Sequence, residues 1–221
     1  MLSASSLPVG SPAPGCPTPV VYPLGHNLYV NITSRCHNRC AMCWKFHPGE
    51  FHDLGLLYAD ASVEPSVNRV VAALEAWPGK YRDLVFCGLG EPLSRPDETL
   101  EVARRVRRLG HSIRINTDGQ AYLYAGRDIL QRLADVVDAL SVSLNAPDAE
   151  TYNRICRPLD PARAFDSILE FLRDAPRYVP DVTATAVRMG SVDLDACARL
   201  AESLGVRFRV RAFDPPPIGV R

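Results

Sequence analysis

The sequence predicts an α/β protein whose core is a partial, open (β/α)6 TIM-like barrel. Two observations support this fold class: short apolar strand segments alternate with amphipathic helical segments, and the chain has six such units. Spread over roughly 195 residues, the units average about 32 residues, close to the ~30 of a βαβ repeat. Eight units would close a full barrel. A flat, doubly wound sheet is the alternative, and either fold places an active site at the carboxyl ends of the strands.

The six strand segments are short runs rich in aliphatic and β-branched residues. They cover Leu28–Thr33, Leu84–Phe86, Ile113–Asn116, Val136–Ser143, Val182–Val187 and Val206–Ala212.

The helical segments carry apolar residues on one face, at the spacing of an amphipathic helix. Ser94 and Pro96 predict a helix start, as N-cap and first-turn residue, and Gly110 and Gly205 predict helix ends. The predicted helices cover Pro65–Trp77, Pro96–Leu109, Arg127–Leu133, Ala162–Arg173 and Leu194–Leu204.

The N-terminal residues differ in composition from the rest of the chain. Residues 1–25 contain six prolines among small residues and show no apolar period. We expect them to form a flexible tail or a strap lying on the domain, and residues 26–221 to form the barrel domain.

Charge and apolar content limit the function classes. The 221 residues carry 25 Lys plus Arg and 25 Asp plus Glu, so no overall field attracts nucleic acid or an anionic membrane. No apolar run approaches the ~20 residues that span a bilayer, and no secretion signal is evident. The expectation is a cytoplasmic protein that binds neither nucleic acid nor membrane.

Three of the seven cysteines are crowded into the stretch RCHNRCAMC, as Cys36, Cys40 and Cys43. An odd count with this crowding indicates a metal site rather than a disulfide framework. A zinc-binding interaction module is one reading, with His37 or Cys16 as a fourth ligand. The other is an iron–sulfur cluster with three thiolate ligands and one open iron, where a substrate or cofactor binds. The position just after the first strand favours an active site.

Cys36, Cys40 and Cys43, with three and two residues between them, resemble the cluster motif of radical S-adenosylmethionine (SAM) enzymes. The resemblance implies a [4Fe-4S] cluster whose open iron is chelated by the amine and carboxylate of SAM. In that family the reduced cluster cleaves SAM to methionine and a 5′-deoxyadenosyl radical, which abstracts hydrogen from a substrate. The family usually has an aromatic residue before the third cysteine; this chain has Met42 there, with Trp44 after the cysteine. Met42 is the candidate contact to adenine.

Further motifs follow the next strands, where cofactor contacts are expected. CGLGEPL supplies Gly88, Gly90 and Glu91, which resemble the family's glycine-glycine-glutamate motif for the methionyl amine. A plain turn before a helix is the structural alternative. The third strand ends at Asn116, a candidate polar contact to cofactor or substrate, or part of an Asp-Gly turn.

The fourth strand leads into SVSLNAPDAETYNRICRP. Ser143 and Asn145 lie where related enzymes contact the ribose. Arg154 and Arg157 are candidates for pairing with the methionyl carboxylate, since arginine binds carboxylates in a bidentate manner; solvated helix positions are the alternative. Cys156 is a candidate catalytic residue or substrate contact, with a small buried thiol as the alternative.

On the sixth strand, arginines alternate with apolar residues. Arg211, nearest the strand's end, is the candidate anchor for a substrate carboxylate or phosphate. The competing interpretation is an edge strand that carries charge to prevent aggregation. Cys87 and Cys197 are expected in the core.

Several stretches, among them LYVNITSRCHNRCAMC and LGLLYADASVEPS, resemble the small TatD-linked radical SAM proteins. The resemblance implies association with a TatD-type hydrolase. Radical chemistry also implies an external electron donor such as flavodoxin or ferredoxin. We expect a small-molecule substrate, with a glycyl-radical activase acting on a partner protein as the alternative.

Overall fold

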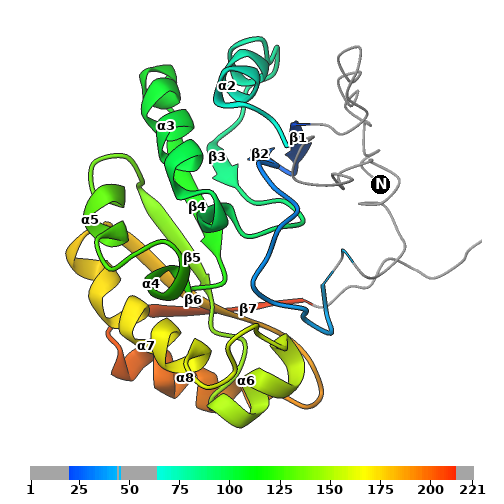
Figure 1. Cartoon of the computed structure of the whole chain (residues 1–221), viewed down its shortest axis with the longest axis vertical. Coiled ribbons are helices and arrows are strands. Elements are labelled where there is room, and N and C mark those ends of the chain that lie inside the picture. The colour runs from blue at the N-terminus through cyan, green and yellow to red at the C-terminus, as the bar shows by residue number, and fades with distance from the viewer. Residues whose placement is uncertain (1–19, 44, 46–63, 213–221) are drawn as a thin grey trace, which may run out of the picture.

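The computed structural model describes residues 20–43, 45 and 64–212, which form one curved sheet with helices along one side (Figure 1). The seven strands lie side by side in chain order, and only β1 is antiparallel to its neighbour. The strands are β1 (Val21–Leu24), β2 (Asn27–Val30), β3 (Asp83–Phe86), β4 (Ser112–Thr117), β5 (Ala139–Ser143), β6 (Asp181–Val187) and β7 (Arg207–Arg211).

The predicted fold class, an open α/β barrel, is confirmed. Strands β2 to β7 are the six expected parallel strands, and the sheet does not close. The additional strand β1 lies within the residues that the sequence assigned to a tail or strap. Its register pairs Leu24 with Asn27, so Gly25 and His26 make a tight hairpin turn. Gly25 has φ 59°, which glycine adopts without strain. Pro23 is tolerated because β1 is an edge strand.

The helices follow the strands, as expected for right-handed parallel crossovers. They are α2 (Val67–Glu75), α3 (Pro96–Val106), α4 (Ala121–Tyr124), α5 (Ile129–Leu133), α6 (Ala149–Cys156), α7 (Ala164–Asp174) and α8 (Leu194–Ser203), with 3-10 turns η3 (Pro92–Ser94), η4 (Arg107–Leu109) and η5 (Ala175–Arg177). The five predicted helices are present, and α4 and α6 are additional.

The start of α3 differs from the prediction. Ser94 is the last residue of η3 and Arg95 is the N-cap of α3, which has no side-chain cap. The reason is Glu91, whose carboxylate accepts a hydrogen bond from Leu93 N and begins η3 one turn earlier. Pro96 is the first residue of α3, as predicted, and Gly110 and Gly205 have the positive φ expected past helix ends.

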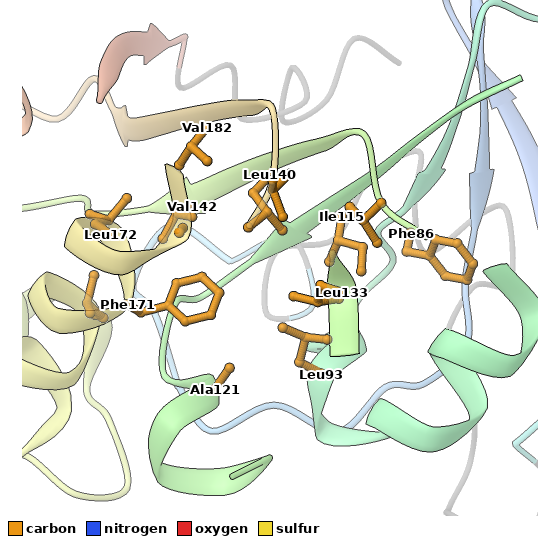
Figure 2. Packing of buried hydrophobic residues seen from close by; sticks show 14 of the residues in the cluster. Phe86, Leu93, Ile115, Ala121, Leu133, Leu140, Val142, Phe171, Leu172 and Val182 are labelled. Atoms are coloured by element: carbon orange, nitrogen blue, oxygen red, sulfur yellow. The ribbon is translucent and has the colours of Figure 1, made fainter. Parts of the chain in front are cut away.

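The apolar core lies between the sheet and its helices. Leu140 and Val142 on β5 and Ile115 on β4 pack with Phe171 of α7 and Leu133 of α5 (Figure 2). All five side chains are buried. Because successive strand residues face opposite sides, the alternate residues of β4 to β7 form a second face of the sheet, which we call the inner face.

Within the part of the chain that the structure describes, no helix is long and apolar enough to span a bilayer.

Candidate active site

The cysteine loop follows β2 and runs along the carboxyl edge of the sheet. Two of its backbone N–H groups donate to carbonyls at the end of α6: Arg39 N to Cys156 O at 3.0 Å, and Ala41 N to Ile155 O at 2.8 Å. The last carbonyls of a helix have no partner inside it, so these bonds satisfy groups that would otherwise need water. The sequence places Cys40 between the two donors, and the loop is thereby fixed beside α6.

The loop after β3 packs closely against the cysteine loop. Glu91 N donates to Arg35 O at 2.7 Å. A Cβ at Gly90 would lie 2.5 Å from the carbonyl oxygens of both Arg35 and Thr33, and one at Gly88 would lie 2.0 Å from Asn31 Oδ1. Neither glycine has positive φ. At Gly90 glycine is therefore required by close approach of backbone rather than by turn geometry, whereas at Gly88 the nearest atoms belong to the Asn31 side chain.

Glu91 has a structural role in the described geometry. Its Oε1 accepts from Leu93 N and Thr117 Oγ1, each at 2.9 Å, and its Oε2 accepts from Asp118 N at 2.6 Å. Burial raises the pKa of this carboxyl, and the negative charge of Asp118 raises it further, while the three hydrogen bonds oppose the shift. The side chain thus joins the loop after β3 to the end of β4.

A buried polar cluster lies behind the cysteine loop. Asn38 Nδ2 donates to Tyr152 Oη at 2.9 Å, and Gln120 Nε2 donates to Asn38 Oδ1 at 2.9 Å. All three side chains are buried. Beside them, the ring of His37 stacks on Tyr124 with centroids 3.7 Å apart. The residues between the cysteines therefore hold the loop in place, and the His37 Nδ1 atom lies 3.6 Å from Asp118 Oδ2.

The three thiols are partly buried and free of disulfide bonds. Burial is the first cause that raises the pKa of Cys36 and of Cys43, whereas for Cys40 the first cause is a hydrogen bond with the Cys156 thiol. Binding of iron would displace these protons. Outside the ranges 1–19, 44, 46–63 and 213–221, no three His, Cys, Asp or Glu side chains converge closely enough for a single metal ion.

This donor set fits an iron–sulfur cluster. Cluster iron takes thiolate ligands, and three cysteines lie on one short loop whose backbone is fixed on both sides. Cys16, a suggested fourth zinc ligand, and Trp44 lie outside the described residues.

The remaining candidate cofactor contacts differ in burial and in their hydrogen bonds. Met42 is buried in the apolar core. Asn145 is buried with φ 58°; its Nδ2 donates to Cys156 Sγ at 3.6 Å and its Oδ1 accepts from Val187 N at 3.3 Å. Arg154 and Arg157 are exposed, and Arg157 is the left-handed C-cap of α6.

Asn116, Ser143 and Arg211 lie on the inner face near the carboxyl edge. Arg211 Nη2 lies 3.5 Å from Ser143 Oγ. Burial raises the pKa of the Cys87 thiol, and the Asn116 side chain lowers it. Cys87 is only partly buried and belongs to this polar group, so the expectation of a core residue is wrong there. Cys197 is fully buried in the core, as predicted.

Sequence reasoning missed two further arginines of the inner face. Arg209 Nη2 lies 3.5 Å from Ser141 Oγ, and Arg114 Nη1 lies 3.7 Å from Asp83 Oδ2. The alternation of Arg207, Arg209 and Arg211 was the available signal. This alternation does not reveal which face of the sheet the arginines occupy. The structure shows that they lie on the inner face.

The chain belongs to the radical SAM superfamily. The model of the Radical SAM superfamily matches residues 30–204, which include the cysteine loop and every strand from the end of β2 to β6. The superfamily resemblance is thereby confirmed, and the protein is a radical SAM enzyme. The narrower TatD-linked resemblance rests on the sequence alone, and its segment LGLLYADASVEPS falls largely outside the described residues.

Two curated relatives illustrate the range of the family. The chain is 30% identical over 154 residues to a probable dual-specificity RNA methyltransferase RlmN of Deinococcus deserti, covering 68% of this chain and 43% of the relative. It is 31% identical over 124 residues to the tungsten-containing aldehyde ferredoxin oxidoreductase cofactor-modifying protein of Pyrococcus furiosus, covering 53% of this chain and 30% of the relative. The chain thus spans less than half of either relative.

Solved radical SAM structures share the fold. SuiB of Streptococcus suis, bound to S-adenosylmethionine, superposes with a TM-score of 0.66 at 15% identity, over 88% of this chain and 42% of SuiB. A radical SAM methyltransferase from Sphaerobacter thermophilus superposes with a TM-score of 0.60 at 18% identity, over 90% and 60%. These likenesses support the open-barrel assignment.

One expectation is corrected by the comparisons. The neutral charge predicted that nucleic acid is excluded as a partner, but several curated relatives are probable RNA methyltransferases. A balanced total charge says nothing about a local site, because cations on one face can be offset by acids elsewhere.

Proposed function

We propose that this protein binds a [4Fe-4S] cluster through Cys36, Cys40 and Cys43 and binds SAM at the carboxyl edge of the sheet. When bound, the reduced cluster supplies the electron that cleaves SAM to a 5′-deoxyadenosyl radical, which abstracts hydrogen from a substrate. The observation that carries the proposal is the fixed cysteine loop at the carboxyl edge, in a chain of the radical SAM superfamily.

The protein's own residues position the reactants in this proposal. Gly90 permits the loop after β3 to approach the cysteine loop, and the buried Glu91 keeps that loop joined to β4. We assign the contact with the methionyl amine to the Gly88–Gly90 region. Its backbone carbonyls would accept hydrogen bonds from the amine. Asn116 and Ser143, on the inner face, are the proposed polar contacts beneath the cofactor.

Anaerobic reconstitution tests this proposal. Protein loaded with iron and sulfide is expected to contain about four irons with matching sulfide, and to release 5′-deoxyadenosine from SAM after reduction. Cys40→Ala is expected to lose both properties, while Cys197→Ala, which changes a core thiol of α8, is expected to retain them. One bound zinc, or 5′-deoxyadenosine no higher than in Cys40→Ala, would overturn the proposal.

Methyl transfer to an RNA substrate is a second candidate function, because the RlmN relatives are probable RNA methyltransferases. The chain covers only part of those proteins, so their activity does not transfer as a whole. Incubating the loaded enzyme with RNA and with SAM labelled at the methyl group distinguishes the cases: label in RNA supports this candidate, and unlabelled RNA removes it. Action on a partner glycyl-radical protein, and association with a TatD-type hydrolase, remain predictions from the sequence.

A further inference from the structure

The inner face carries cations that lack acidic partners. Arg207 pairs with Asp181, and Arg114 lies 3.7 Å from Asp83, so each has a carboxylate nearby. Arg209 and Arg211 form no ion pair with any carboxylate of residues 20–43, 45 and 64–212. Their guanidinium groups reach only Ser141 Oγ and Ser143 Oγ, each at 3.5 Å. Serine hydroxyls at that distance are weak partners for a full charge.

Arg211 is also partly removed from solvent. Its Nε atom is buried and has no hydrogen-bond partner among the described residues, and burial lowers the pKa of the guanidinium. A buried charge without a partner is costly, and proteins retain such groups where a ligand supplies the opposite charge. Arg211 is the last residue of β7, so it lies at the carboxyl edge of the sheet, along which the cysteine loop runs.

The strand's position at the sheet edge does not explain Arg211. Charges that protect an edge strand need only point into solvent, and Arg207 and Arg209 are both exposed, whereas Arg211 is partly buried. The guanidinium groups of Arg209 and Arg211 reach Ser141 Oγ and Ser143 Oγ of β5. β6 lies between β5 and β7 in the sheet (Figure 1). The strand register confirms that Ser143 and Arg209 lie on the same face of the sheet, because Ser143 pairs with Thr185 and Thr185 pairs with Arg209.

Open space adjoins Arg209 on the side away from Arg211. A cavity of about 510 Å³ lies at the amino ends of the strands; Arg209 and Ser141 line it together with Asp83, Asp181 and Arg207, whereas Arg211 and Ser143 do not. Cavities of roughly 300–1,000 Å³ accommodate small ligands or a group of a larger one. The inner face therefore has room for a ligand next to Arg209, and Arg211 lies beyond this space, toward the carboxyl edge.

We propose that Arg211 and Arg209 bind an anionic group of the substrate, a carboxylate or a phosphoryl group, and so orient the substrate toward the cysteine loop. This inference rests on the proposed function, because it assigns the substrate class of the same site. Ser143 and Ser141 donate the accompanying neutral hydrogen bonds. A guanidinium binds either oxyanion in a bidentate manner, so the chemistry is shared by the two sources.

Isothermal titration of the cluster-loaded full chain with inorganic phosphate, and separately with acetate, tests the proposal. We expect binding of at least one anion, weakened at least tenfold by Arg211→Met and retained in part by Arg211→Lys. Arg207→Met is the matched control on the same strand and face, and its affinity is expected within twofold of wild type. Arg209→Met replaces Arg211→Met if the latter does not fold. Preference for phosphate or for acetate identifies the phosphoryl or the carboxylate source.

Three results would overturn the proposal: neither anion binds, Arg207→Met and Arg211→Met weaken binding equally, or saturating SAM abolishes anion binding. The last result would assign the arginines to the methionyl carboxylate instead. Release of 5′-deoxyadenosine by wild-type protein is measured separately, so loss of that activity reports on the proposed function and leaves the anion measurement intact.

Discussion

Gly90 shows how one absent side chain defines the site. A Cβ at this position would lie 2.5 Å from two carbonyl oxygens of the cysteine loop, both of them backbone atoms. Neither atom can rotate away, so the loops must separate.

We therefore expect Gly90→Ala to lower the free energy of unfolding by about 1–3 kcal/mol, the usual cost of overpacking, and to reduce the iron content of reconstituted protein at least threefold. Urea unfolding and iron analysis measure the two effects. Gly190→Ala is the control, because a Cβ there meets nothing within 4 Å. Equal iron content in the two variants would contradict the packing role of Gly90.

Glu91 provides a second test at the level of single residues. Its carboxylate accepts hydrogen bonds from three groups, and removing it leaves the buried Leu93 N, Asp118 N and Thr117 hydroxyl without their acceptor. We expect Glu91→Ala to cost about 3 kcal/mol of stability by urea unfolding. Glu101→Ala, on the exposed face of α3, is expected to cost at most about 0.5 kcal/mol. A loss for Glu91→Ala as small as the control's would refute the assigned hydrogen-bond role.

The sequence identified Glu91 as a site residue but not what its side chain does. Motif spacing places residues at a strand end, and it carries no information on which backbone N–H groups a carboxylate will meet. Asn145 illustrates the same point, because its amide bonds Cys156 and Val187 within the fold. Cys87 was expected in the core because thiols are frequently buried, and only the register reveals that it faces Asn116.

At the level of elements, Asp138 joins two strands and a helix end. Its Oδ2 accepts from Ile113 N at 2.7 Å, and its two oxygens accept from Arg107 Nη1 at 2.5 Å and Nη2 at 2.8 Å. The hydrogen bonds from Arg107 lower the pKa of Asp138 below its ordinary value of 3.8. A lowered carboxyl pKa stabilises the fold above the unfolded-state pKa, and this stability is lost as pH falls through the folded-state pKa.

We expect Asp138→Ala to cost about 1 kcal/mol at pH 7, a value reduced for the partial exposure of the ion pair. The difference from wild type is expected to shrink as the pH falls below 3.8. Urea titrations at a series of pH values measure it. A difference that stays constant with pH would mean that packing, and not the carboxylate, is the source of the effect.

The elements that sequence reasoning missed have identifiable physical causes. Strand β1 was assigned to a tail because Pro23 and its neighbours show no apolar period, yet its pairing with β2 provides the stabilisation. Helix α6 is only eight residues long, so apolar periodicity is hard to detect. Its N-cap signal is present: Asp148 accepts from Thr151 N. The long, periodic helices α3, α7 and α8 were predictable because their apolar faces cover the sheet.

At the level of the whole molecule, the curved sheet separates two functions between its faces. One face packs against helices through aliphatic and aromatic side chains (Figure 2). The inner face carries serines, asparagine and arginines that end near the cysteine loop. The total charge of zero conceals this arrangement, which is why composition misjudged the possible partners. Local charge, and not the net value, determines which substrates the open barrel can accept.

The central claim is that SAM binds an iron of a cluster held by Cys36, Cys40 and Cys43. Electron paramagnetic resonance of the reduced, reconstituted protein tests it most directly. If one iron lacks a protein ligand, adding SAM changes the ligands of that iron, and the g values of the cluster signal shift. A four-iron signal that remains identical with and without saturating SAM would contradict the claim.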